Sequence, residues 1–501
     1  MSFPFGSARA FFGGATPQPA TPEDEPPSPG FLKSLFRPRR ARRTKLQGTG
    51  FRVEGLEPRY LLSADVAPFL VDMQDLGDDL SLRYDQLTSS IQIYDRSSGT
   101  QLGQQLVQQM SLVRVSGTAG DDTLELDFSD SFVMPVEVEF DGGGGTDTVM
   151  LTGGAGDTLA VEATGSGTAD LLLQDDGAEG AVRLSGTEAV EDRLAAGERV
   201  FADRTDAGNS LRLSDSGGTS DGMSRITTGG SLLDYSFETP EVSLTVDTGA
   251  GDDRLENGGM DQTLAGKVVM QGGAGSDTLA GPPEDTVWRI TGDNEGDAAG
   301  IAFSAVETLE GAADNEDVFI VGAEASMDGV LDGGEGGFDV LEFDGGTFER
   351  VTYEAFDLHS GVVDRDGSLI RYAGLEPIND SMVVADRTIS TGTLALGPTD
   401  ADDRATLTDN GDGTMTLAPV SPFLTFETIN FAKPTNSLTV QLAGDLDVPF
   451  VSKDVLTVDG TGTAIDLSGI DLTIDGEAGK DEVVFEGTVT TGNLTVNAES
   501  I

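Results

Sequence analysis

The chain of 501 residues contains no cysteine, a single histidine and a single tryptophan. Without cysteine it has no disulfide, thiolate nucleophile, zinc–cysteine site or iron–sulfur cluster. The lone histidine, His359, excludes any site built from two imidazoles, and no G-x-S-x-G sequence accompanies it. We therefore interpret His359 as a surface or structural residue and expect a protein that is not an enzyme.

Long apolar runs and basic side chains are also scarce. No run of eighteen apolar residues occurs, so we expect no transmembrane segment. The first thirty residues lack the apolar stretch of an ordinary signal peptide. Acidic residues outnumber basic ones by 87 to 30, which gives a net charge of −57. This charge repels nucleic acid and anionic membranes, and it favours cations as partners.

The N-terminal part has a different composition from the rest. Residues 15–30 are rich in proline and residues 31–45 are basic, so we predict a disordered tail over 1–45. Within 46–68 the sequence L-E-P-R-Y-L-L runs from Leu56 to Leu62. It resembles the LEPR-XLL element of very large, repetitive bacterial surface or secreted proteins. The resemblance implies an export or processing signal and a secreted or cell-surface location.

From residue 69 onward, short stretches of alternating apolar and polar residues indicate β-strands. In VEVEF (136–140), for example, Val136, Val138 and Phe140 share one face. Clusters of Gly, Asp, Asn and Thr separate these stretches, and amphipathic helices are scarce. The sequence therefore predicts an all-β protein.

Many of the separating clusters share one motif, G-G-x-G-x-D-x-U-x, in which U is apolar. GGAGSDTLA (272–280) and GGGGTDTVM (142–150) match fully, and several others deviate by one residue: GTAGDDTLE (117–125), TGAGDDRLE (248–256), GEAGKDEVV (476–484) and GGEGGFDVL (333–341). The motif resembles the RTX repeats, which form parallel β-rolls with Ca²⁺ between turns. Here the motifs are scattered, whereas RTX repeats follow one another every nine residues. The resemblance implies calcium as cofactor.

The chemistry of the motif supports the same cation. Glycines permit tight corners, and aspartate supplies the hard oxygen ligands that Ca²⁺ prefers. The candidate metal-binding residues are therefore the motif aspartates and the glycines beside the two full matches: Asp122, Asp147, Asp253, Asp277, Asp339, Asp481, Gly143, Gly145, Gly273 and Gly275. A purely structural role, in which aspartate caps the main chain of a turn, is the alternative, and it is favoured for Asp157 and Asp317.

The spacing of the motif aspartates suggests how they meet. Asp122 and Asp147 are 25 residues apart, Asp253 and Asp277 are 24 apart, and Asp317 and Asp339 are 22 apart. This is about one coil of a parallel β-solenoid, whose neighbouring strands lie about 4.8 Å apart. We predict parallel β-helix or β-roll-like solenoid segments in which paired aspartates share a cation. Tandem β-sandwiches are the alternative architecture.

A longer repeat is also present. LRLSDSG (211–217) corresponds to ATLTDNG (405–411), and SLTVDTG (243–249) corresponds to SLTVQLA (437–443). We predict repeat units over 69–200, 201–394 and 395–501. The last unit has no capping element, so we expect it to be truncated and the chain to be the start of a longer polypeptide.

Together these features predict a calcium-stabilised, non-enzymatic structural or adhesive segment of a giant exported bacterial protein. Surface polysaccharide is a candidate ligand of such an adhesin-like protein. A secreted glycosidase or polysaccharide lyase on a β-helix is the alternative function, with catalytic carboxylates that the sequence does not single out.

Overall fold

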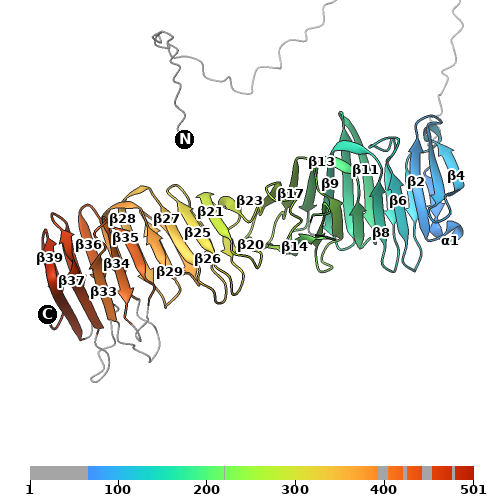
Figure 1. Ribbon diagram of the computed structural model, residues 1–501. Helices are drawn as coiled ribbons and strands as arrows, with labels where there is room; N and C mark the ends of the chain where they lie inside the picture. Colours follow the sequence, from blue (N-terminus) through green and yellow to red (C-terminus); the bar gives the residue numbers. More distant parts are fainter. Residues whose placement is uncertain (1–65, 219, 393–403, 421–425, 443–453, 477–479) are drawn as a thin grey trace, which may run out of the picture. The chain divides into compact units, whose positions relative to one another are not determined.

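The computed structural model describes residues 66–218, 220–392, 404–420, 426–442, 454–476 and 480–501. The chain divides into two units, residues 1–62 and 63–501, and all of the described residues belong to the second. This unit consists almost entirely of β-strands, which form two long sheets, A and B (Figure 1). Its only described helices are α1 (Met73–Leu76) and the 3₁₀ helix η1 (Val107–Gln109).

Sheet A is one continuous ladder of strands. In spatial order its strands are β1 (Phe69–Asp72), β5 (Val113–Ser116), β7 (Val138–Asp141), β11 (Ala178–Ser185), β10 (Thr168–Asp175), β9 (Ala155–Gly165), β13 (Ala195–Asp203), β17 (Ser243–Asp247), β19 (Val268–Gln271), β23 (Ile301–Ser304), β22 (Glu295–Ala298), β21 (Val287–Gly292), β25 (Val318–Gly322), β27 (Val340–Asp344), β31 (Ile378–Asp380), β35 (Ile429–Ala432), β34 (Thr414–Pro419), β33 (Arg404–Asp409), β37 (Asp454–Leu467) and β39 (Asp481–Thr491).

Sheet B is a second continuous ladder. In spatial order its strands are β4 (Thr100–Leu106), β3 (Ser90–Asp95), β2 (Asp79–Asp85), β6 (Thr123–Asp127), β8 (Thr148–Thr152), β12 (Ala189–Asp192), β16 (Asp234–Glu238), β15 (Met223–Thr227), β14 (Ser210–Asp215), β18 (Arg254–Asn257), β20 (Thr278–Ala280), β24 (Thr308–Glu310), β26 (Val330–Asp332), β30 (Ser368–Ala373), β29 (Gly361–Arg365), β28 (Thr347–Ala355), β32 (Val383–Ser390), β36 (Ser437–Gln441), β38 (Asp471–Asp475) and β40 (Leu494–Asn497).

The chain passes alternately from one sheet to the other, and each passage back and forth makes one coil. Strand β5 of sheet A leads into β6 of sheet B, β7 leads into β8, and β17 leads into β18. Strands of successive coils pair in parallel, for example β6 with β8 and β17 with β19. The predicted all-β solenoid is therefore confirmed, and the chain does not fold as tandem sandwiches.

Antiparallel meanders of three strands interrupt the parallel pairing. Sheet A contains the meanders β9–β10–β11, β21–β22–β23 and β33–β34–β35, and sheet B contains β2–β3–β4, β14–β15–β16 and β28–β29–β30. In β9–β10–β11 the chain steps forward past two strands and returns, so that β11 pairs with β7 and β9 pairs with β13. The related sequences at 211–217 and 405–411 begin two such meanders, one in each sheet.

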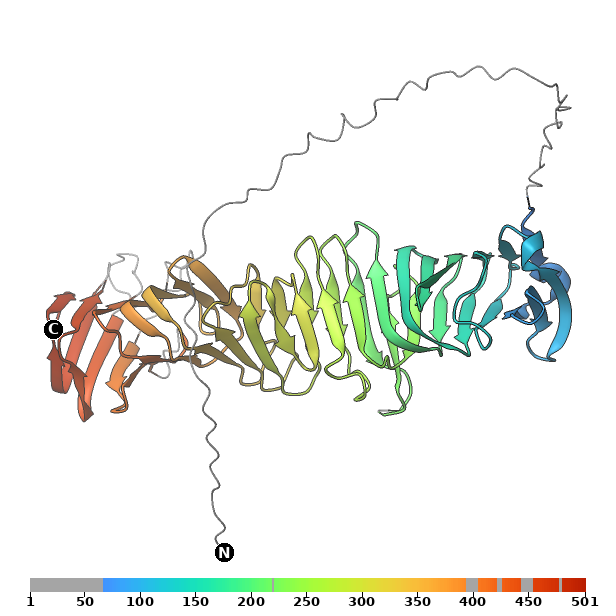
Figure 2. The same ribbon diagram turned by 90° about the horizontal axis from the view of Figure 1, so that it is seen from above.

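The core lies between the two sheets, which face each other along the stack (Figure 2). Alternate residues point inward, as in Val113 and Val115 of β5 and in Leu124 and Leu126 of β6, all of which are buried. This is the pattern that alternation in the sequence predicts. The sole tryptophan, Trp288, is fully buried and stacks on Phe319, with ring centroids 5.3 Å apart.

Charged side chains also enter this core, in two similar networks. Arg199 Nε donates a hydrogen bond to Asp192 Oδ2 at 2.7 Å, and the Tyr235 hydroxyl donates to the same oxygen at 2.8 Å. In the second network Arg387 donates through Nη1, and Tyr353 through its hydroxyl, to Asp380 Oδ2. Both arginines are completely buried and lie seven residues after their aspartates. Each network therefore places a charge pair and a tyrosine hydroxyl inside the apolar core.

Candidate functional site

The motif aspartates lie at the corners where the chain passes between the sheets. Asp122 precedes β6 and Asp147 precedes β8, and these two strands are paired neighbours in sheet B. The N–H of Asp122 donates to Asp147 Oδ1 at 2.8 Å, and the N–H of Asp147 donates to Glu188 Oε2 at 2.7 Å. The carboxylates of Asp147 and Glu188 thus each join their own coil to the main chain of the neighbouring coil. The carboxylate of Asp122 instead accepts hydrogen bonds from Thr118 in its own turn. We call this series ladder 1.

A second series, ladder 2, repeats this arrangement further along the same edge. The N–H of Asn209 donates to Asp253 Oδ1 at 2.7 Å, and that of Asp253 donates to Asp277 Oδ1 at 2.9 Å. The N–H of Asp277 then donates to Glu307 Oε2 at 2.8 Å. The structure therefore brings Asp253 and Asp277 together in adjacent coils, as their spacing of 24 residues predicts.

The third series, ladder 3, lies at the opposite edge, where sheet B leads into sheet A. The N–H of Thr286 donates to Asp317 Oδ1 at 2.8 Å, and the N–H of Asp317 donates to Asp339 Oδ1 at 2.7 Å. Asp317 is therefore a member of ladder 3, because its Oδ1, like that of Asp339, accepts a main-chain N–H from the neighbouring coil. At the same edge Asp481 begins β39, and its N–H donates to Glu499 Oε2 at 2.8 Å.

Asp157 has a different environment from the ladder aspartates. It is exposed in β9, and its Oδ2 accepts a hydrogen bond from the N–H of Asp176 at 3.0 Å. It therefore has the structural role that the sequence favours, and it offers an exposed aspartate outside the ladders for comparison.

The ladders use only one oxygen of most carboxylates. Asp122, Asp147, Asp253, Asp277, Asp317 and Asp339 are all at most 2% exposed. The second carboxylate oxygen, Oδ2, is buried without a hydrogen-bond partner in Asp147, Asp253, Asp277 and Asp317. A buried carboxylate oxygen without a partner is costly, because water that solvated it has been removed. At Asp317 the Trp288 side chain and the Ala312 main chain also act on the carboxylate and lower its pKa against the effect of burial. The oxygens of Asp147, Asp253 and Asp277 are therefore the ones that the protein leaves least satisfied.

Three of the four orphaned oxygens, in Asp147, Asp277 and Asp317, lie near a carbonyl oxygen beside the glycine at the first place of the motif. A Cβ built on Gly311 would collide with both Asp317 Oδ2 and the carbonyl oxygen of Gly333 in the next coil. The same holds at Gly272, where a Cβ would meet Asp277 Oδ2 and the Ala305 carbonyl oxygen. Glycine at the first place of the motif therefore allows a carboxylate oxygen and a carbonyl oxygen of the next coil to lie close to its own main chain. Such hard oxygen donors suit Ca²⁺.

The predicted glycines lie in the same corners but serve packing. Gly275 has a φ of 142°, and a Cβ there would collide with the Gly251 carbonyl oxygen of the preceding coil. The other three predicted glycines are likewise at positive φ, against carbonyl oxygens of the preceding coil: Gly143, Gly145 and Gly273. The corner carbonyls are partly used within the protein, since Gly249 O accepts a hydrogen bond from the Ala274 N–H at 3.0 Å.

Burial changes the acidity of the ladders. Loss of solvent, together with the negative charges of Asp277 and Asp203, raises the pKa of Asp253 to about 6. Burial and the charge of Asp317 raise the pKa of Asp339 to about 6 as well. The pKa values of Asp147, Asp277 and Asp317 are also raised, chiefly by burial. In each case the folded chain disfavours the ionised carboxylate unless a cation accompanies it.

The raised pKa values predict that the metal-free protein gains stability as the pH falls from 7 to 5. An unfolded aspartate titrates near about 3.9, so over this range the folded state takes up protons and the unfolded state does not. We expect a gain of about 1 kcal/mol from each of Asp253 and Asp339. Denaturant unfolding of chelator-treated protein at several pH values measures this gain in the free energy of unfolding. The Asp253→Asn/Asp339→Asn double variant should flatten the dependence, and a wild-type stability that declines steadily from pH 7 to 5 would contradict it.

Sequence reasoning missed the glutamates that end the ladders. Glu188 and Glu307 each lie directly before a strand of sheet B, as the motif aspartates do, but without the glycines of the motif. Glu188 lies 41 residues after Asp147, and Glu307 lies 30 residues after Asp277, because a three-stranded meander intervenes in each case. The only signal in the sequence is an acidic residue directly before an alternating stretch.

No protein-family model matches the sequence, and no curated protein matches it significantly. The LEPR-XLL element at 56–62 and the predicted tail over 1–45 lie outside the described residues. Among the described residues, the helices are too short to cross a lipid bilayer.

Proposed function

We propose that this chain is a calcium-stabilised, non-enzymatic scaffold from an exported bacterial surface protein of the adhesin type. The observation that carries the proposal is the set of buried, partnerless Oδ2 atoms at Asp147, Asp253, Asp277 and Asp317. These carboxylates, with carbonyl oxygens of the adjacent coil, would hold Ca²⁺. When bound, the ion supplies the positive charge that the ladders lack.

The charge of the whole chain supports the same role. A net charge of −57 opposes compact folding through self-repulsion when no cation is bound. Extracellular calcium modules bind with dissociation constants of about 10⁻⁴–10⁻³ M, so millimolar calcium outside a cell stabilises them and the cytosol does not. Export would then be coupled to folding. In the absence of cysteine, cation sites rather than disulfides would connect the coils.

The alternative function, a polysaccharide-degrading enzyme, finds no support in the ladders. Their aspartates are buried and hydrogen-bonded to the main chain of a neighbouring coil, so they do not present a carboxylate pair to a polymer. Surface polysaccharide stays a candidate ligand of the scaffold, to be bound through exposed residues.

A calcium titration tests the proposal. We expect the metal-free chain to gain thermal stability with a midpoint near about 10⁻⁴–10⁻³ M calcium, to lose it again in EGTA, and to respond weakly to magnesium, which accepts irregular oxygen sites poorly. Trp288 fluorescence and circular dichroism report the transition. Equal unfolding temperatures in calcium, magnesium and EGTA would refute it.

A further inference from the structure

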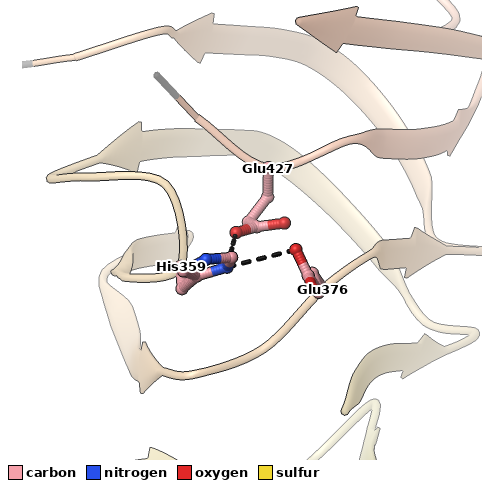
Figure 3. A group of neighbouring side chains, drawn as sticks. All are labelled: His359, Glu376 and Glu427. Atoms are coloured by element: carbon pink, nitrogen blue, oxygen red, sulfur yellow. Dashed lines mark ion pairs between the residues drawn. The ribbon is translucent and has the colours of Figure 1, made fainter. Parts of the chain in front are cut away.

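Outside the hydrogen-bonded ladders, the sole histidine meets two glutamates from different segments (Figure 3). His359 lies in the loop between β28 and β29, Glu376 in the loop between β30 and β31, and Glu427 two residues before β35. The Nδ1 atom of His359 is 2.8 Å from Glu427 Oε1 and 3.1 Å from Glu376 Oε2. Both carboxylates therefore point at one imidazole nitrogen.

The contact between His359 and Glu427 is close but not a hydrogen bond. Glu427 is only 3% exposed, and its Oε1 is buried without a hydrogen-bond partner although Nδ1 lies 2.8 Å away. The side chains of His359 and Glu376 are 45% and 37% exposed, so one side of the cluster opens to solvent. Both atoms are potential metal ligands, and they lie closer together than two ligands of one metal ion, so a bound cation would replace this direct contact.

The charges around the cluster favour a cation as well. Glu427 is buried, and Glu376 and Asp357 are its negative neighbours. Among the described residues, no lysine or arginine forms an ion pair with either glutamate. Within the part of the chain that the structure describes, His359 is the only basic side chain that forms an ion pair with these two glutamates.

We propose that His359 Nδ1, Glu376 Oε2 and Glu427 Oε1 form a binding site for a divalent transition metal such as Zn²⁺. The imidazole nitrogen selects such a metal over Ca²⁺ and Mg²⁺, which take oxygen ligands. The three ligand atoms all lie within 4.8 Å of one another. Tetrahedral zinc with bonds of about 2.0–2.2 Å separates its ligands by about 3.4 Å. The two contacts of Nδ1, at 2.8 and 3.1 Å, would therefore lengthen by about 0.6 and 0.3 Å on binding.

The metal would fasten three segments that are distant in the sequence: the β28–β29 loop, the β30–β31 loop and the approach to β35. Three protein ligands on a half-open site leave a fourth position for water. The main-chain N–H of Glu376 donates to the carbonyl oxygen of Asp339, so the site adjoins ladder 3. The inference still does not rest on the calcium proposal, because it uses a nitrogen donor and the side-chain oxygens of Glu376 and Glu427, which are not among the orphaned aspartate oxygens. A protonated His359 bridging two glutamates is the competing explanation.

The single histidine makes the test specific. In the full chain labelled with ¹⁵N-histidine and kept in calcium, we expect one equivalent of Zn²⁺ to shift the Nδ1 resonance and a chelator of zinc to reverse the shift. Cobalt should bind in place of zinc and give the visible absorption of a tetrahedral site. If His359 is only an ion-pair partner, the imidazole resonances will be the same with and without zinc, which overturns the proposal.

Variants separate the ligands from the fold. His359→Gln and Glu427→Gln should each weaken zinc binding, measured by calorimetry, by more than the roughly 10–100-fold that loss of an outer partner costs a metal site. Asp221→Asn, in the all-carboxylate cluster of Asp215, Asp221 and Asp261, is the matched control and should leave zinc binding unchanged. Should Glu427→Gln fail to fold, the half-exposed His359→Gln still decides, and unchanged zinc affinity in that variant overturns the proposal.

Discussion

Asp277→Asn is expected to stabilise the protein in EGTA and to destabilise it in calcium. In the metal-free chain the asparagine keeps the Oδ1 that accepts the Asp253 N–H, and it removes a buried charge whose second oxygen has no partner. We expect a gain of about 1–2 kcal/mol, the cost typical of an unsatisfied buried polar group. In calcium at about 100 times the dissociation constant, loss of one site costs about 2.7 kcal/mol.

The reversal of sign is what distinguishes a metal site from a structural ladder. Thermal unfolding of both proteins in 10 mM calcium and in EGTA, followed by fluorescence, measures it; Trp288 packs beside Gly281, close to Asp277 in the chain. Asp157→Asn changes an exposed aspartate outside the ladders and serves as the control. If Asp277→Asn shifts stability equally in both buffers, the ladder acts only through its hydrogen bonds.

Arg199→Ala should destabilise the fold by about 3–5 kcal/mol, with or without calcium, because it leaves Asp192 as an uncompensated charge in the core. Arg199 and Asp192 are both fully buried, and Tyr235 contributes its hydroxyl to the same carboxylate. Burial and the charge of Asp192 raise the pKa of Tyr235, so the hydroxyl stays protonated and cannot replace the lost cation.

Denaturant unfolding checks this value against an exposed pair. Arg212 pairs with Glu256 on the surface, where both side chains are more than one-third exposed, so Arg212→Ala should cost less than about 1 kcal/mol. Arg387→Ala, in the second network, should resemble Arg199→Ala. Similar small losses in Arg199→Ala and Arg212→Ala would show that the buried network contributes no more than a surface pair.

The all-β solenoid and the pairing of its aspartates follow from local rules. Alternation in stretches such as 136–140 places apolar residues inside, and spacings of 22–25 residues bring motif aspartates into adjacent coils. Both signals recur at regular spacing in the sequence: the alternation every two residues within a strand, and the motif aspartates once per coil. They do not reveal that the first carboxylate oxygen already binds the main chain of the next coil.

The remaining features depend on contacts between segments that no regular spacing in the sequence indicates. In meanders such as β9–β10–β11 the chain steps forward past two strands and returns. The residue that follows Asp147 in ladder 1 is therefore Glu188, which lies 41 residues later in the sequence. Asp192 and Arg199 form the sequence D-x₆-R, and this spacing does not distinguish a buried ion pair from one on the surface. His359 meets Glu376 and Glu427 only because three loops converge.

Anomalous X-ray diffraction from crystals grown in calcium tests the central claim most directly. The account predicts calcium peaks about 2.3–2.6 Å from Oδ2 of Asp277 and of Asp317, each with carbonyl oxygens of the adjacent coil among its ligands. Ladders with intact hydrogen bonds between coils and no anomalous peak beside any of these oxygens, at saturating calcium, would contradict it.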